Sequence, residues 1–228
     1  MKSALIVGAS RGLGLGLVGE LLSRGWRITA TARGPAPELA AMVPSASGRL
    51  DIESVDILRP GEVRELAGRL SGRAYDLLFL NAGIMAGRGQ PLAQVDDADI
   101  ASIFMTNAIG PIRAADALLG LAAPGATVAF MSSILGSIAT NDDGRAELYR
   151  ASKAALNSLI RSFRARHAAR SDLTVLALHP GVVRTSMGGP TAPLDIPTSV
   201  KGVADVLAAR AGAGGTAFVD YRNEIIPW

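Results

Sequence analysis

Short apolar runs alternate with longer helical patterns from one end of this chain to the other, and this order leaves few folds open. Most of the apolar runs are continuous, as expected of strands that are buried on both faces of a sheet. We expect strands at 4–7, 26–31, 49–56, 76–80, 126–131, 173–178 and 216–219. Helices are expected at 12–24, 61–70, 96–121, 149–170 and 199–210. The alternation predicts an α/β fold with a doubly wound parallel sheet, helices on both faces and right-handed crossovers.

The composition narrows the class of protein. The chain has 228 residues, of which 49% are hydrophobic, and no linker or repeat, so residues 1–228 are expected to form a single domain. Cysteine is absent, which excludes disulfides and zinc–cysteine sites. The net charge is only +3 and aromatic residues make up 4%, so we expect no nucleic-acid partner. No apolar run approaches the ~18 residues of a membrane span, and we expect a soluble, cytoplasmic protein without a membrane partner.

A glycine-rich stretch, Gly8-Ala-Ser-Arg-Gly12-Leu-Gly14, follows the first apolar run and opens the first expected helix. Glycines at such a junction let the chain turn sharply and bring backbone N–H groups close to a pyrophosphate. A tight turn without a ligand is the alternative. The position between a strand and a helix at the start of the chain favours a Rossmann-type dinucleotide site. The predicted cofactor-binding residues of this loop are Gly8, Ser10, Arg11, Gly12, Leu13 and Gly14.

The end of the second expected strand bears on which dinucleotide binds. An acidic residue there usually holds a ribose 2′-OH, whereas a 2′-phosphate needs cations. This strand ends in Arg33, no acid follows before Glu38, and Arg11 lies inside the glycine loop. Two guanidinium groups without a carboxylate favour NADP(H) over NAD(H). The alternative is that both are ordinary surface arginines of an Arg-rich protein.

Tyr149 and Lys153 stand four residues apart in a stretch that favours helix. This spacing places the phenol and the ammonium one turn apart on the same helix face. Because a nearby cation favours the phenolate, we expect Lys153 to lower the pKa of Tyr149. Such a pair can exchange a proton with a substrate oxygen near neutral pH. A coincidental contact between two helix side chains is the alternative.

Further motifs follow the remaining strands in a fixed order. They are Asp56-Ile57, Asn81-Ala82-Gly83, Asn107 in the long helix, Ser133, and Pro180-Gly181-Val-Val183-Arg-Thr185. Together with the glycine loop and the Tyr149–Lys153 pair, they resemble the short-chain dehydrogenase/reductase family over essentially the whole chain. The run from Tyr149 to Asn157 and the ending from Phe218 to Trp228 are similar to the C-factor-like branch of that family.

The resemblance implies a role for four side chains. Tyr149 would be a general acid on a carbonyl or a general base on an alcohol, while Ser133 would hydrogen-bond the substrate oxygen. Lys153 would lower the pKa of Tyr149 and hydrogen-bond the nicotinamide ribose. Asn107 would hold a water that links Lys153 to solvent, with polar packing in the helix as its alternative role. The predicted catalytic residues are therefore Asn107, Ser133, Tyr149 and Lys153.

The resemblance also implies cofactor contacts beyond the glycine loop, with the adenine near Asp56 and the carboxamide near Thr185. The complete set outside the loop is Arg33, Asp56, Ile57, Asn81, Ala82, Gly83, Tyr149, Lys153, Pro180, Gly181, Val183 and Thr185.

These motifs predict an NADP(H)-dependent oxidoreductase that moves a hydride between the nicotinamide and a small carbonyl or secondary-alcohol substrate. A dinucleotide-binding signalling or regulatory protein of C-factor type, with incidental turnover, is the alternative. Ala-rich faces on the helices at 96–121 and 149–170, together with the habit of the family, lead us to expect a homodimer or homotetramer.

Two loops and one histidine complete the predictions. The segment between Ser133 and Tyr149 is longer than the commonest family spacing, and we expect it to shape the substrate entrance. Its acidic residues have no histidine nearby, so no metal site is expected there. The segment at 186–197 is expected to form a short lid over a permissive pocket. His179 is interpreted as a structural hydrogen-bonding group rather than an acid–base catalyst.

Overall fold

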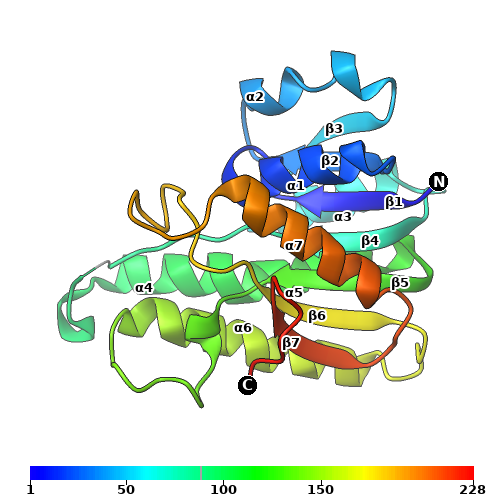
Figure 1. Ribbon diagram of the computed structural model, residues 1–228. Helices are drawn as coiled ribbons and strands as arrows, with labels where there is room; N and C mark the ends of the chain where they lie inside the picture. The colour runs from blue at the N-terminus through cyan, green and yellow to red at the C-terminus, as the bar shows by residue number, and fades with distance from the viewer. Residues whose placement is uncertain (88) are drawn as a thin grey trace.

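Seven strands form one parallel sheet in the computed structural model, which describes residues 1–87 and 89–228 (Figure 1). The strand order is β3-β2-β1-β4-β5-β6-β7. The strands are β1 (Ser3–Val7), β2 (Arg27–Ala32), β3 (Leu50–Ser54), β4 (Tyr75–Leu80), β5 (Ala122–Met131), β6 (Thr174–His179) and β7 (Thr216–Asp220). This architecture confirms the predicted α/β fold with a doubly wound sheet.

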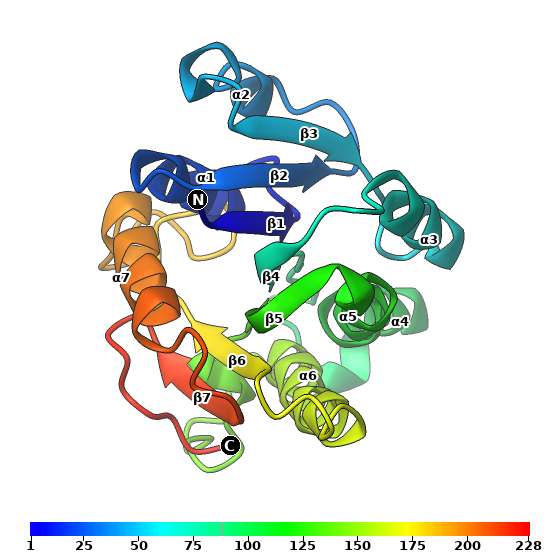
Figure 2. The same ribbon diagram turned by 90° about the vertical axis from the view of Figure 1, so that its right-hand side faces the viewer.

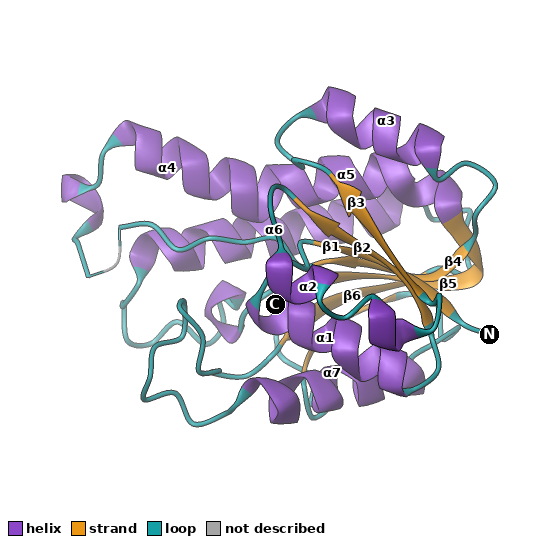
Figure 3. Ribbon diagram, turned by 90° about the horizontal axis from the view of Figure 1, so that it is seen from above, coloured by secondary structure: helices purple, strands orange, loops and turns teal. Residues whose placement is uncertain are grey.

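Helices cover both faces of the sheet (Figures 2 and 3). The helices are α1 (Gly12–Ser23), α2 (Pro37–Ala40), α3 (Pro60–Arg69), α4 (Asp97–Phe104), α5 (Gly110–Leu118), α6 (Glu147–Arg166) and α7 (Ile196–Ala209). One core lies between the sheet and α3, α5 and α6, and the other lies between the sheet and α1, α2 and α7. None of the described helices is long and apolar enough to cross a membrane.

The two cores explain why the apolar runs are continuous. Successive strand residues point to opposite faces, so Leu5 and Val7 pack in the core beneath α6, whereas Ala4 and Ile6 pack in the core beneath α1. All four side chains are buried. Since both faces exclude water, every position of the strand favours an apolar residue.

Some boundaries differ from the sequence-based expectations. The expected helix at 96–121 is divided by a π-helical turn, Met105–Ile109, and β5 begins at Ala122 rather than at residue 126. The helix expected at 149–170 is shifted, because α6 begins at Glu147 and ends at Arg166. The short helix α2 was not expected. π-Helical turns of this kind occur frequently at functional sites, and this one contains Asn107.

The chain end returns along the outer edge of β7. Val219 pairs with Ile225 in an antiparallel bridge, the Asp220 N–H donates to Glu224 O at 3.0 Å, and the Ile226 N–H donates to Phe218 O at 2.9 Å. Ile226 is buried, and the Trp228 ring lies 5.5 Å from the ring of Phe218. The carboxyl-terminal half of β7 is thereby hydrogen-bonded on both edges.

Candidate active site

The glycine loop connects β1 to α1 and lies against the end of β4. Gly8 and Gly12 have positive φ angles of 90° and 57°, which favour glycine. At Gly14 a Cβ atom would lie 2.2 Å from the Gly8 carbonyl oxygen, so no larger residue fits without a shift of the backbone. Arg11 precedes α1 without a side-chain cap, and the first N–H groups of the helix therefore remain available to a phosphate.

Asn81 joins this loop to β4. Its Nδ2 donates to Gly8 O at 2.7 Å, and its backbone N–H donates to Val7 O at 2.9 Å. The Gly8 N–H donates to Thr31 Oγ1 at 3.2 Å. The loops after β1, β2 and β4 thus meet where the strand order changes direction, which is the usual ligand site of an α/β sheet.

A cavity of about 280 Å³ opens at this edge of the sheet. The predicted cofactor-binding residues that line it are Gly8, Ser10, Arg11, Gly12, Leu13, Arg33, Asp56, Ile57, Asn81, Ala82, Gly83, Lys153 and Thr185. The predicted residues outside its lining are Gly14, Tyr149, Pro180, Gly181 and Val183. Gly14 contributes indirectly, since it permits the close approach of Gly8.

The segment after β6 supports the cavity from behind. A Cβ atom at Gly181 would lie 2.4 Å from Leu194 Cδ1, and Val183 forms a bridge with Leu194. Ser199 Oγ donates to Pro180 O at 2.6 Å, which ties this segment to α7. Residues Pro180 to Val183 therefore pack against neighbouring segments, whereas Thr185 lines the cavity.

Sequence reasoning missed several lining residues. They are Val7, Thr31, Val55, Leu58, Ile84, Thr106, Met131, Ser186 and Met187. Val7, Thr31, Val55 and Met131 lie at the ends of strands or directly after them, so the order of the strands in the sheet is the signal that identifies these four. No local motif marks them.

Two guanidinium groups at the cavity have no anionic partner among the described residues. Arg11 and Arg33 both line it and are exposed. Among the described residues, neither side chain makes an ion pair or a hydrogen bond, in contrast to residues such as Arg24 and Arg73. Two unpaired cations at the mouth of one cavity create a positive potential suited to a phosphate.

Tyr149 and Lys153 lie on one face of α6 as their spacing predicts. Lys153 Nζ is 5.9 Å from the centroid of the Tyr149 ring and donates to Met131 O at 2.9 Å. Tyr149 is 8% exposed and Lys153 is 3% exposed. Lys153 is the member of the pair that reaches the cavity.

The expected lowering of the Tyr149 pKa is wrong for this structure. Burial raises the pKa of Tyr149 to about 12, while a hydrogen bond with Ser133 acts in the opposite direction. Burial also lowers the pKa of Lys153 to about 8. Because both charged forms lose hydration inside the protein, burial shifts both pKa values toward the neutral forms. The phenol is therefore protonated at neutral pH.

Ser133 begins a short 3-10 turn, η5 (Ile134–Gly136), directly after β5. Its Oγ accepts a hydrogen bond from the Leu135 N–H at 3.1 Å, which orients the hydroxyl. The hydroxyl also acts on Tyr149, since it lowers the pKa of the phenol. Ser133, after β5, and Tyr149, in α6, thus influence each other although they lie in different elements.

Asn107 occupies the π-helical turn between α4 and α5 and is fully buried. Its Oδ1 accepts from the Ile84 N–H at 2.8 Å, and its Nδ2 donates to Ile84 O at 2.9 Å and to Ser152 Oγ at 3.0 Å. The side chain therefore anchors the loop after β4. This arrangement agrees with the alternative, packing role for the amide more closely than with a water-holding role.

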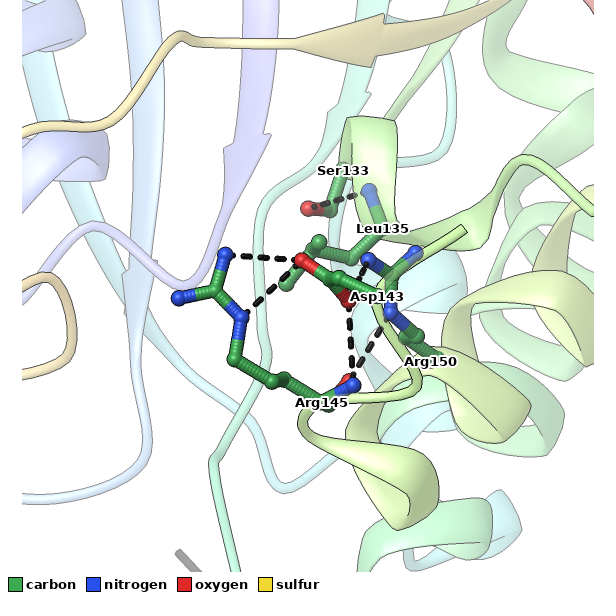
Figure 4. Close-up of polar contacts among 5 residues, drawn as sticks. All are labelled: Ser133, Leu135, Asp143, Arg145 and Arg150. Atoms are coloured by element: carbon green, nitrogen blue, oxygen red, sulfur yellow. Dashed lines mark hydrogen bonds and ion pairs between the residues drawn. The ribbon is translucent and has the colours of Figure 1, made fainter. Parts of the chain in front are cut away.

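The long segment between Ser133 and Tyr149 is fixed by a buried arginine that sequence reasoning missed. Arg150 is 7% exposed; its Nε donates to Arg145 O at 2.8 Å and its Nη2 donates to Asp143 Oδ1 at 2.8 Å. Figure 4 shows the Asp143 carboxylate between the guanidinium groups of Arg145 and Arg150. The Asp143 carboxylate thus forms ion pairs with both arginines, and these contacts hold the loop against α6.

His179 differs from its expected role. Its side chain makes no hydrogen bond with the described residues, and its Nδ1 is buried without a partner. Burial lowers the pKa of His179 to about 4, aided by Arg222, and outweighs the nearby Asp220 carboxylate that favours the charged ring. The interpretation of His179 as a structural hydrogen-bonding group is therefore wrong.

His179 is expected to weaken the protein in acid. Above pH ~6.5 the ring is neutral in both states, whereas between pH ~6.5 and ~4 it is protonated only in the unfolded chain. Unfolding then takes up a proton, and the free energy of unfolding should fall by on the order of 3 kcal/mol across this window. Urea titrations at several pH values should show a shallower fall in His179→Gln. Equal slopes in the two proteins would contradict this assignment.

Comparisons with known proteins identify the family of this chain. A family model described as short chain dehydrogenase matches residues 2–193. The C-signal of Myxococcus xanthus is 41% identical over 168 residues, covering 73% of this chain and 100% of that protein.

Solved structures superpose over the whole chain. A protein described as a short-chain dehydrogenase/reductase from Burkholderia multivorans, with bound NADP, matches with a TM-score of 0.96 and 44% identity, covering 100% of this chain and 99% of that one. A carbonyl reductase from Pseudomonas aeruginosa in complex with NADP matches with a TM-score of 0.91 and 42% identity, covering 100% of both chains. These findings confirm the resemblance seen in the sequence, including that to the C-factor-like branch. The chain therefore belongs to the short-chain dehydrogenase/reductase family.

Proposed function

We propose that this protein is an NADP(H)-preferring oxidoreductase that interconverts a small carbonyl compound and the corresponding secondary alcohol. The observation that carries the proposal is the buried Tyr149–Lys153 pair on α6, with Ser133 lowering the pKa of the phenol and Lys153 lining the cavity beside the glycine loop. The similarity to structures with bound NADP supports the choice of cofactor.

The cavity fits a phosphorylated dinucleotide. Gly8 and Gly14 allow the backbone to approach closely, and the uncapped start of α1 suits a pyrophosphate. Arg11 and Arg33 would hold the 2′-phosphate, and Asp56 and Ile57, which line the same cavity, would contact the adenine. When bound, NADP(H) supplies or accepts the hydride.

The side chains of this chain would handle the proton. Tyr149, whose phenol is protonated at neutral pH, would donate its proton to the carbonyl oxygen during reduction. Ser133 would donate a hydrogen bond to the same oxygen and hold it in line. Lys153, whose Nζ lies 5.9 Å from the centroid of the Tyr149 ring, would stabilise the resulting phenolate by its charge.

The walls near Tyr149 favour an uncharged substrate. Tyr149 belongs to an apolar cluster whose partly buried members include Met85, Leu135 and Met187. The nearby Asp143 is neutralised by Arg145 and Arg150. Ketones and aldehydes with apolar substituents suit these surroundings better than carboxylates do.

A turnover assay tests the proposal. The purified protein is mixed with NADPH and a panel of ketones and aldehydes, and loss of NADPH absorbance is followed. Consumption that depends on the carbonyl compound would support the proposed activity. Tight NADPH binding without consumption would contradict it and favour the signalling alternative, to which the similarity with C-signal gives weight. The assembled Ser133, Tyr149 and Lys153 support turnover as the principal activity.

Arg33 is expected to set the cofactor preference. The wild-type protein should prefer NADPH over NADH by more than about tenfold in kcat/KM, because a guanidinium–phosphate contact contributes on the order of 1.5–3 kcal/mol. Arg33→Ala should reduce this preference mainly by weakening the use of NADPH. Arg27→Ala is a matched control, since Arg27 is an exposed arginine at the other end of β2. A wild-type preference for NADH would overturn the assignment.

We also propose a homodimer or homotetramer. The outward faces of α5 and α6 carry exposed small residues, including Ala117, Ala151, Ser158 and Ala165. Small side chains permit close approach of helices from two subunits.

A further inference from the structure

Asn157 lies one helical turn beyond Lys153, on the face of α6 that already carries Tyr149. It is 3% exposed and does not line the cofactor cavity. Both the oxygen and the nitrogen of its amide nevertheless make a hydrogen bond: Ser132 Oγ donates to Asn157 Oδ1 at 2.6 Å, and Asn157 Nδ2 donates to Gly136 O at 3.1 Å. A buried amide with two such hydrogen bonds fixes the positions of its two partners, Ser132 and Gly136.

Both partners of Asn157 belong to the turn that carries Ser133. Ser132 is the residue before Ser133, and Gly136 is the last residue of η5. The Gly136 N–H donates to Ser133 O at 2.8 Å and closes the turn, while the Ser132 N–H donates to Leu178 O at 2.7 Å. Asn157 therefore holds the turn at both ends.

The contact between this turn and α6 is very close. A Cβ atom at Gly136 would lie 2.9 Å from the carbonyl carbon and oxygen of Lys153 and 3.0 Å from Asn157 Nδ2. The backbone of the turn thus touches the helix backbone at the lysine of the site. A displacement of η5 would therefore move Ser133 relative to Tyr149.

We propose that Asn157 is a positioning residue, which acts through Ser132 and Gly136 to hold the Ser133 hydroxyl in register with Tyr149. The inference rests on the proposed reduction or oxidation at this site and identifies what sets its geometry. Displacements of about 1 Å at a reacting centre can lower rates by about 10²-fold. The joint, by which we mean the two hydrogen bonds that Asn157 makes with Ser132 and Gly136, is therefore sufficient to affect kcat.

The test compares variants at both ends of the joint. Asn157→Ala removes both contacts, Ser132→Ala removes one, and Ser132→Thr keeps a hydroxyl and serves as the conservative variant. We expect kcat to fall about tenfold or more in Asn157→Ala and several-fold in Ser132→Ala, with recovery in Ser132→Thr. The dissociation constant for NADPH, measured by fluorescence, should stay within about twofold of wild type, since neither residue lines the cavity.

The pH dependence of kcat separates positioning from general stability. Ser133 lowers the pKa of Tyr149 against the burial that raises it, so displacement of Ser133 should move the apparent pKa of the phenol upward. Tyr75→Phe is the matched control. It removes a buried 2.7 Å hydrogen bond to Thr29 at the opposite end of the sheet, and should lower stability without altering kcat or its pH profile.

Two results would overturn the inference. One is a folded Asn157→Ala protein with the kcat and pH profile of wild type. The other is a fall in kcat in Asn157→Ala that is no larger than the fall in Tyr75→Phe when the two variants are equally stable. If the wild-type protein shows no turnover at all, the proposed function fails, and the joint is then judged by the crystal structure of Asn157→Ala. Displacement of Ser133 Oγ from Tyr149 Oη would support the inference, and an unchanged position would refute it.

Discussion

Tyr149→Phe should lower kcat for carbonyl reduction by about 10²–10⁴-fold while leaving the affinity for NADPH nearly unchanged. The substitution removes the proton that the phenol would donate but keeps the ring, which packs in the apolar cluster with Leu148 and Ile103. Tyr149 does not line the cofactor cavity, so binding of the dinucleotide should not depend on its hydroxyl. Steady-state kinetics and NADPH titrations on the same preparation would measure both quantities.

The loss of kcat should be specific to the Tyr149 hydroxyl. Tyr75→Phe, which changes a buried tyrosine at the far end of the sheet, should keep full activity. Velocity retained in Tyr149→Phe would remove the basis of the proposed chemistry, because no other phenol lies beside Ser133 and Lys153 among the described residues.

Gly14→Ala should abolish useful NADPH binding and destabilise the fold. The added methyl group would lie 2.2 Å from Gly8 O and 2.6 Å from Asn81 Nδ2, and these are the two atoms that join the glycine loop to β4. Overpacking of this kind costs about 1–3 kcal/mol or more, and relief would require the loop to move out of the cavity. We expect at least a ~10²-fold weaker affinity for NADPH, measured by fluorescence titration, and a melting temperature lower by several degrees.

Gly19→Ala is the control on the same helix. A Cβ atom there would meet only Met42 Cε at 3.4 Å, an ordinary contact, and alanine is the better helix former. This variant should bind NADPH normally and be as stable as wild type or slightly more so. Normal NADPH affinity in Gly14→Ala would show that the glycine loop does not hold the cofactor.

The sequence predicts much of this architecture because its strongest signals are local. Continuous apolar runs such as 4–7 and 76–80 identify buried strands, and polar or glycine motifs directly after them identify the functional edge of the sheet. The spacing of Tyr149 and Lys153 is sufficient to place them on one helix face. Chain connectivity then brings Ser133, at the end of β5, next to them.

What the sequence does not predict depends on contacts between distant segments. The pKa of Tyr149 follows from how deeply the ring is buried, which spacing along a helix does not reveal. The anchoring of Asp143 by Arg150 and of η5 by Asn157 requires the folded positions of loop and helix. The π-helical turn around Asn107 likewise depends on its three bonds to Ile84 and Ser152.

The returning chain end has a consequence for assembly and solubility. Open strand edges readily recruit strands from other molecules, which leads to sheet extension or aggregation. Here the Phe218 carbonyl already accepts from the Ile226 N–H, and the Asp220 N–H already donates to the Glu224 carbonyl. Few backbone groups along that half of β7 therefore remain for a strand of a neighbouring molecule. The last residues thus occupy the backbone groups that an incoming strand would need along that half of β7.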